Sequence, residues 1–273
     1  MGKKVFVIDV AKCSGCYCCQ LACKDEHCGN DWSPIAKPQP DIGQFWMKVN
    51  DFARGTTPKV KVHYVPELCN HCDNPGCVAA AKNGAVYKRE DGLVIIDPEK
   101  AKGQKQIAEA CPYGAIYWNE EFDIPQKCTG CAHLLDNGYA VPRCVEMCPT
   151  GALTFGDEEE MKDEVLGAEV MKPETGMFPN VYYRNIPGQF IAGTVYDPVE
   201  KEVIIGAKVR CLQGGKIMTT VTDEYGDFWF NDLAKGLYDV VIQAKGYEFK
   251  TFDKVDVKDV CVNLGDIPME KAK

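Results

Sequence analysis

The spacing of the cysteines constrains this chain more than any other feature of its sequence. The chain has 273 residues and 16 cysteines, and fourteen of these lie between Cys13 and Cys148. Most fall in C-x-x-C groups, and two of the cysteines, Cys111 and Cys148, are followed by proline. A disulfide framework belongs to short secreted chains, whereas cysteines this close together point to a common ligand. The spacing therefore predicts sites that bind metal through thiolates.

Four segments carry these cysteines. They are, in order, Cys13, Cys16, Cys19 and Cys23; Cys69, Cys72 and Cys77; Cys111 alone; and Cys128, Cys131, Cys144 and Cys148. In the C-x-x-C-x-x-C-x-x-x-C spacing of the first segment, three cysteines hold one four-iron, four-sulfur cluster and the fourth ligates another. The reason is reach, because a short loop wraps three corners of a cubane while the fourth thiolate points away. We therefore expect ligands to be shared between distant segments.

An internal repeat shows what the third segment lacks. The pairs Lys12 and Lys100, Gly15 and Gly103, and Cys23 and Cys111 are all separated by the same number of positions. In this register Ala101, Gln104 and Ile107 stand where three thiolates are expected. The fourth thiolate expected in the second segment is replaced by Ala81. If ligands are shared between segments, all four missing thiolates belong to one cluster. One whole site is then deleted, and no site has an incomplete set of ligands.

The remaining cysteines form three sets of four. Set one is Cys13, Cys16, Cys19 and Cys148; set two is Cys69, Cys72, Cys77 and Cys111; set three is Cys23, Cys128, Cys131 and Cys144. The sequence thus predicts three 4Fe-4S clusters on a doubled bacterial-ferredoxin-like domain. Zinc also binds C-x-x-C groups, but it does not explain the long run, the Cys-Pro ends or the joint loss of four ligands.

The other cysteines have simpler interpretations. Cys18 and Cys28 are interpreted as buried free thiols that pack near a cluster. A disulfide is disfavoured because the adjacent Cys18 and Cys19 are badly placed for one. Cys211 and Cys261 lie in strand-like segments and are predicted to be core residues. For the histidines of the cluster loops, His71 and His133, we favour packing or a hydrogen bond over ligation. No catalytic residue is predicted.

Charge and hydropathy exclude several classes of protein. The formal net charge of −9 argues against nucleic acid as a partner. The chain leads directly into a short strand pattern at Val5–Val10, without a signal sequence. No run approaches the roughly 20 apolar residues that a membrane span needs. Thiolate ligands fit a reducing compartment, so the sequence predicts a cytoplasmic protein.

The residue composition of the sequence changes near residue 188. Segments rich in β-branched and aromatic residues follow, at Phe190–Tyr196, Val203–Leu212, Lys216–Thr222, Asp227–Asn231, Tyr238–Ala244 and Phe249–Val257. Gly, Asp and Asn separate these segments at short intervals, which is typical of a small β-sandwich. The expected fold class is α+β, with the cluster domain over 1–187 and an all-β sandwich over 188–273.

The cysteine layout resembles the iron–sulfur subunits of the dimethyl sulfoxide reductase family of molybdenum and tungsten enzymes. The matching phrases are Cys23–Glu26, Cys69–Pro75, Ala110–Ala115, Arg143–Ala152 and Val170–Tyr183. The resemblance covers residues 1 to about 187. It implies an electron-transfer subunit whose large partner holds molybdenum on a bis-pyranopterin guanine dinucleotide cofactor. Most such subunits carry four clusters, so three clusters and an added sandwich are departures from the pattern.

The last part of the chain, residues 189–273, resembles a transthyretin-like or carboxypeptidase-regulatory sandwich, which is also Ig-like. The matching phrases are Thr222–Phe228 and Ala244–Tyr247. The resemblance implies a module that contacts the partner or a second copy of the complex, although fold alone does not give function. Two alternatives stay open for the whole chain. It could serve another molybdopterin reductase or dehydrogenase that feeds an external redox partner, or it could be a scaffold whose clusters are mainly structural.

Overall fold

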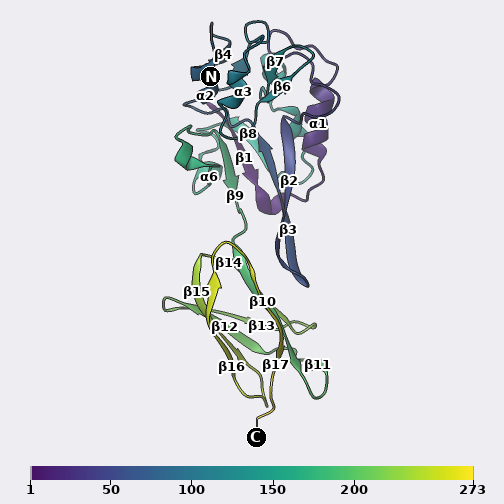
Figure 1. Ribbon diagram of the computed structural model, residues 1–273, viewed down its shortest axis with the longest axis vertical. Coiled ribbons are helices and arrows are strands. Elements are labelled where there is room, and N and C mark those ends of the chain that lie inside the picture. Colours follow the sequence, from purple (N-terminus) through teal and green to yellow (C-terminus); the bar gives the residue numbers. More distant parts are fainter. Residues whose placement is uncertain (1, 273) are drawn as a thin grey trace. The chain divides into compact units, whose positions relative to one another are not determined.

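The computed structural model describes residues 2–272, which form two compact units (Figure 1). The first unit contains the chain up to Asp51 and then His63–Ile186. The second contains Phe52–Val62 and the chain from Pro187 onward. Within residues 2–272, none of the helices is both long enough and apolar enough to cross a membrane.

The first unit consists of short elements joined by long loops. Its helices are η1 Val10–Lys12, α1 Cys18–His27, α2 Gly76–Ala80, α3 Gln106–Glu109, α4 Ala132–Asp136, α5 Arg143–Glu146, α6 Lys162–Val165 and η2 Pro173–Thr175. Its strands are β1 Lys4–Asp9, β2 Met47–Thr56, β3 Lys59–Leu68, β4 Val86–Lys88, β5 Val94–Ile96, β6 Tyr117–Asn119, β7 Ile124–Gln126, β8 Leu153–Asp157 and β9 Val181–Arg184.

Strand β1 is the central strand of the three-stranded sheet in the first unit. It pairs antiparallel with β8 and parallel with β9. Phe6 and Ile8 on one face join the core that holds most of the cysteines, while Val5 and Val7 on the other face pack with Met161. Because both faces are covered, the inner residues of the strand, Val5–Ile8, are all apolar rather than alternating. The pairs β2–β3, β4–β5 and β6–β7 each form a separate two-stranded sheet.

Three similar segments of the sequence, residues 81–86, 111–116 and 148–153, adopt the same backbone conformation at their glycine. Gly84, Gly114 and Gly151 occupy the same place in three phrases, and their φ angles are 64°, 64° and 63°. A side chain is strained at such positive φ values, so each phrase needs glycine at this point of its turn. The turn lets Gly114 donate to the Cys111 carbonyl at 3.1 Å. The sequence repeat is therefore also a repeat of local structure.

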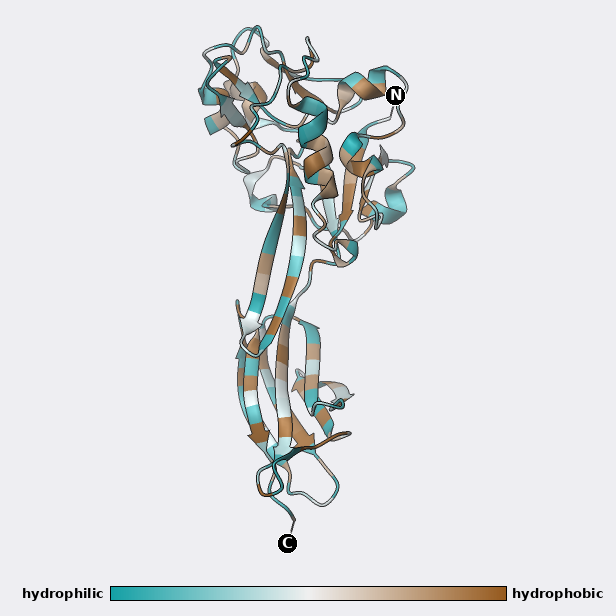
Figure 2. Ribbon diagram, turned by 90° about the vertical axis from the view of Figure 1, so that its right-hand side faces the viewer, coloured by the Kyte–Doolittle hydropathy of each residue, from teal (hydrophilic) through white to brown (hydrophobic). Residues whose placement is uncertain are grey.

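The second unit is built of strands, as the sequence predicts. The strands are β10 Gln189–Asp197, β11 Glu202–Val203, β12 Lys208–Gln213, β13 Lys216–Val221, β14 Asp227–Leu233, β15 Gly236–Gln243, β16 Lys250–Val257 and β17 Val262–Pro268. One sheet has the order β11-β10-β14, with β17 parallel to β10, and the other has the order β13-β12-β15-β16. Hydrophobic and hydrophilic residues alternate along these strands (Figure 2). The inward residues form a core that includes Val195, Val209 and Phe228.

The strand predictions are correct except in two places. The predicted strand Val203–Leu212 is interrupted, because β11 ends at Val203 and β12 begins only at Lys208. Gly206 in this gap has a φ of 73°, which turns the chain. Strand β17 was not predicted, since Asn263, Gly265 and Asp266 weaken its β pattern. The predicted core positions of Cys211 and Cys261 are confirmed, because both are buried.

The tip of the β2–β3 hairpin lies in the second unit and packs on β14. Lys59 is buried and forms an ion pair with Asp227. Lys61 donates to the Asn231 side chain at 2.7 Å, and its ammonium lies 4.6 Å from the centre of the Trp229 ring. These contacts cover the outer face of β14 with cationic side chains over an aromatic ring. Nothing in the sequence indicated them.

Candidate iron–sulfur sites

The four cysteines of set two line one cavity. Cys69 and Cys72 follow the end of β3, Cys77 lies in α2, and Cys111 follows α3. Burial and the thiolates of the other three members raise the pKa of Cys72 to about 12. Four thiols in so small a space cannot all ionise by themselves, because each thiolate opposes the next. They ionise when a metal centre supplies positive charge, so this donor set fits an iron–sulfur cubane.

Set one joins the N-terminal loop to a cysteine far along the chain. Cys13 and Cys16 precede α1, Cys19 lies in its first turn, and Cys148 follows α5. Helix α1 packs against α5, which brings Cys148 to the loop. Burial and the thiolates of the other three members raise the pKa of Cys19 to about 12. The structure thus brings together the four residues that the sequence assigned to this set.

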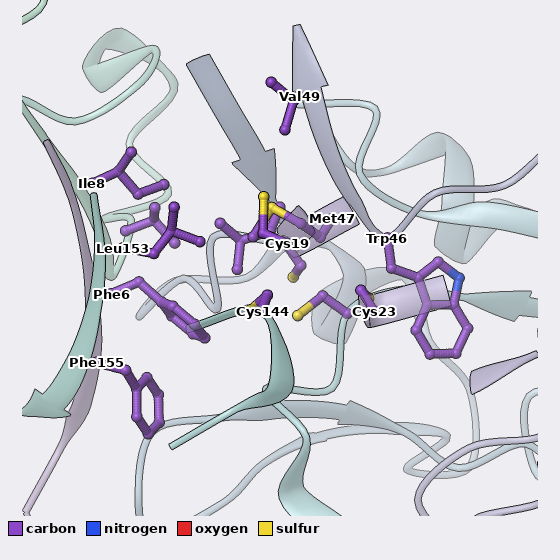
Figure 3. Close-up of a cluster of buried hydrophobic side chains, with 14 of the residues drawn as sticks. Phe6, Ile8, Cys19, Cys23, Trp46, Met47, Val49, Cys144, Leu153 and Phe155 are labelled. Carbon is purple, nitrogen blue, oxygen red and sulfur yellow. The ribbon is translucent and has the colours of Figure 1, made fainter. Parts of the chain in front are cut away.

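Set three lies deepest of the three. Cys23, Cys128, Cys131 and Cys144 are all buried. Figure 3 shows the thiols of Cys19, Cys23 and Cys144 among apolar side chains, with Phe6 and Leu153 on one side and Trp46 on the other. Burial and the thiolates of the other three members raise the pKa of Cys144 well above its usual value. Cys23 therefore lies with three cysteines that are more than 100 residues further along the chain.

Family models match both parts of the chain. Residues 60–158 match a 4Fe-4S dicluster domain, and residues 191–267 match a carboxypeptidase regulatory-like domain. The pyrogallol hydroxytransferase small subunit of Pelobacter acidigallici is 42% identical over 281 residues, which cover 98% of this chain and 100% of that protein. A tetrathionate reductase subunit of Salmonella typhimurium is 34% identical, covering 68% and 73%. A subunit of the anaerobic dimethyl sulfoxide reductase of Escherichia coli is 37% identical, covering 58% and 75%.

The protein belongs to the iron–sulfur subunits of the dimethyl sulfoxide reductase family of molybdoenzymes. These relatives are all subunits of larger enzymes, as their names state. The ferredoxin-like cluster domain and the all-β second domain expected from the sequence are both confirmed at this level.

Backbone amides of the iron–sulfur subunit donate hydrogen bonds to cysteine sulfurs. Gly130 donates to Cys128 Sγ at 3.3 Å. The amides of Ala115, Tyr113 and Gly114 lower the pKa of Cys111, against the larger effect of burial, which raises it. Such hydrogen bonds stabilise the thiolate and are one of the means by which a protein sets a cluster potential. The tight loops that hold the cysteines thus also supply the donors.

The three sets form a row in the order one, three, two. The Cys19 thiolate of set one raises the pKa of Cys23 and Cys144 in set three, where burial is the largest cause. At the other side of set three, the Cys69 thiolate of set two adds to the effect of burial on the pKa of Cys128. Set three therefore lies between the other two, and the sequence had left this order open.

Side chains fill the region where the sequence predicts a deleted site. Ala101 and Ile107 are fully buried and pack with Cys77 of set two. Gln104 is 8% exposed, and its side chain accepts from the Lys82 amide at 2.8 Å and donates to the Lys100 carbonyl at 2.7 Å. Packing and hydrogen bonds therefore occupy this region, and it lies beside set two, at one end of the row.

We expect Gln104→Ala to lower the free energy of unfolding by about 1–3 kcal/mol, because a Lys82 amide then loses its partner. Guanidinium unfolding of the subunit, followed by circular dichroism, measures this loss. Lys102→Ala is the matched control, since Lys102 is exposed in the same segment. If the two variants lose equal stability, Gln104 does not support this region.

The two histidines of the cluster loops have partners outside the thiol sets. His71 Nδ1 accepts from the Val94 amide at 3.0 Å. His133 Nε2 lies 3.0 Å from the Glu26 carboxylate, and its ring stacks on Trp32 at 4.4 Å. These contacts agree with the expected packing and hydrogen bonding.

The prediction for the two spare cysteines of the first unit is wrong in one respect, because neither is buried. Cys18 begins α1 beside Cys16, where the exposed turn leaves it accessible. The Cys28 thiol instead donates to the Asp41 carboxylate at 3.1 Å.

A single-ion site is the alternative that the sequence raised for these cysteines. Among residues 2–272, no three Cys, His, Asp or Glu side chains are placed to hold one metal ion. A tetrahedral zinc site needs four ligands around one point, whereas a cubane takes one thiolate at each of its four irons.

Proposed function

We propose that this chain holds three 4Fe-4S clusters and relays single electrons to and from a molybdenum-containing catalytic subunit. The ligands would be sets one, two and three as defined above. The observation that carries the proposal is the grouping of twelve thiols into three sets, each of which combines segments that are distant in sequence. Each cluster, when bound, accepts and releases one electron.

The chain's own residues would provide the environment of this relay. Burial of the set three cysteines keeps water from the middle of the row, and amide donors such as Gly130 stabilise the thiolates. The cluster domain would span 1–187. The sandwich over 188–273 would contact the partner or a second copy of the complex. We also propose a cytoplasmic location, because thiolate ligands persist in a reducing compartment.

For the complex as a whole we propose hydroxyl transfer between polyhydroxybenzenes, from pyrogallol to phloroglucinol. Two observations favour it. The match to a pyrogallol hydroxytransferase small subunit runs over nearly the whole of both chains, sandwich included. The filled position also lies at one end of the row, beside set two. A hydroxyl transfer involves no net oxidation, so it needs no exit for electrons at that end. The alternatives are a molybdopterin reductase or dehydrogenase with an external redox partner and a structural scaffold.

Iron analysis of the isolated complex tests the proposed cluster content. We expect about twelve irons per copy of this chain, since each cubane holds four. Low-temperature paramagnetic resonance should show reduced clusters after addition of dithionite. About sixteen irons, or stoichiometric zinc, would contradict the ligand sets. Spectra that do not change with dithionite would favour the structural scaffold.

A further inference from the structure

One buried cation of the first unit has no carboxylate partner. Lys127 follows directly after β7 and is 2% exposed. Its ammonium donates to two carbonyls, those of Val94 and Cys128, the latter at 3.0 Å. Within residues 2–272, no Asp or Glu forms an ion pair with it. Lys59, which is also buried within residues 2–272, differs in this respect, because it pairs with Asp227.

Such an ammonium requires compensation. A charge that is removed from water is strongly destabilising unless an opposite charge or a metal site lies nearby. The two carbonyls accept from two of its three N–H groups but do not cancel its charge. The His71 imidazole, which accepts from the Val94 amide, offers no negative charge either. The compensating negative charge must therefore come from the thiolates.

The position of Lys127 indicates which thiolates these are. Val94, whose carbonyl it binds, lines the cavity of set two. Cys128, whose carbonyl it also binds, is a member of set three. Cys77 of set two lines the same cavity as Val94. Lys127 thus lies at the junction of sets two and three.

We propose that Lys127 is the shared counter-cation of the clusters in sets two and three and raises the reduction potentials of both. The proposal rests on the proposed function, because it requires clusters at these sets. One-electron reduction makes a thiolate-ligated cluster more negative, and a fixed cation at short range favours that reduced form. No proton is taken up in this step. Set one lies on the far side of set three, so Lys127 should affect it least.

Redox titration of the assembled complex, followed by paramagnetic resonance, tests this role. Lys127→Met removes the charge and keeps much of the side-chain volume. At the potential where a wild-type cluster of set two or three is half reduced, the ratio of reduced to oxidised cluster should fall at least tenfold. That ratio corresponds to a shift of about 59 mV for one electron. The cluster of set one should shift much less, and Lys127→Arg should keep the wild-type potentials.

Lys88→Met is the matched control. Lys88 also binds a carbonyl of set two, that of Cys72 at 3.0 Å, but it is paired with Asp73 and partly exposed. We expect a smaller shift from it than from Lys127→Met. The proposal is overturned if Lys127→Met retains its full iron and its reduction potentials do not shift. It is also overturned if the potentials of all three clusters shift equally.

Lys127→Gln covers the case in which the methionine variant loses iron, since its amide can still donate without a charge. If both neutral variants lose the iron of sets two and three while Lys127→Arg retains it, the requirement for charge is supported. If Lys127→Arg also loses it, the role is steric and the proposal is overturned. A wild-type complex without clusters would instead contradict the proposed function itself.

Discussion

Serine in place of Cys111 should remove the same cluster as serine in place of Cys72. The two residues lie in different segments of the sequence, but they line one cavity with Cys69 and Cys77. A hydroxyl is a poor substitute for a soft thiolate ligand of iron, so we expect each variant to lose about four of about twelve irons. Iron analysis gives the amount of the loss, and paramagnetic resonance of the reduced complex shows which signal has disappeared.

Cys18→Ser is the control for a non-specific effect of losing a thiol. Cys18 lies next to Cys16 and Cys19 of set one but belongs to no set. We expect this variant to keep all of its iron and all three signals. If Cys111→Ser and Cys72→Ser abolish different signals, or if Cys111→Ser abolishes none, the assignment of Cys111 to set two is wrong.

The grouping of the thiols could be predicted because it follows from the short spacing of the cysteines within each loop. A loop as short as Cys13–Cys19 has few ways to present three thiolates to one cubane, and Cys23 must then point elsewhere. The repeat supplied a second constraint on the ligand sets, since it aligned Cys111 with Cys23 and revealed that four expected ligands are absent. The second unit was predictable for a similar reason, because alternation along a strand depends only on which face is buried.

What the sequence did not predict depends on long-range packing. Lys127 has no feature that separates it from an exposed lysine, and only the fold shows that it is buried between two sets. Likewise, the sequence shows Lys59 and Lys61 only as part of a polar hairpin. It does not indicate that they contact Asp227 and Trp229 in the fold. The order of the sets also escaped prediction, because the spacing of cysteines gives membership but not the neighbours of each set.

Serine in place of Cys148 should damage the cluster of Cys13 and leave that of Cys144 in place. Cys148 lies only four residues after Cys144, yet it is close to Cys13 and Cys16 because α1 packs against α5. Cys23→Ser should give the converse result, with loss of the set three signal and retention of set one. Each variant should lose about four irons, so only the identity of the lost signal separates them.

This pair of variants is the strictest test of shared ligation, since it reverses what proximity in sequence suggests. If each cluster took its ligands from one segment, Cys23→Ser would abolish the signal that depends on Cys13, and Cys148→Ser the one that depends on Cys144. The double variant Cys13→Ser/Cys148→Ser provides the internal check. If the two residues ligate one cluster, the double variant should lose no more iron than either single variant. If they ligate two clusters, it should lose twice as much.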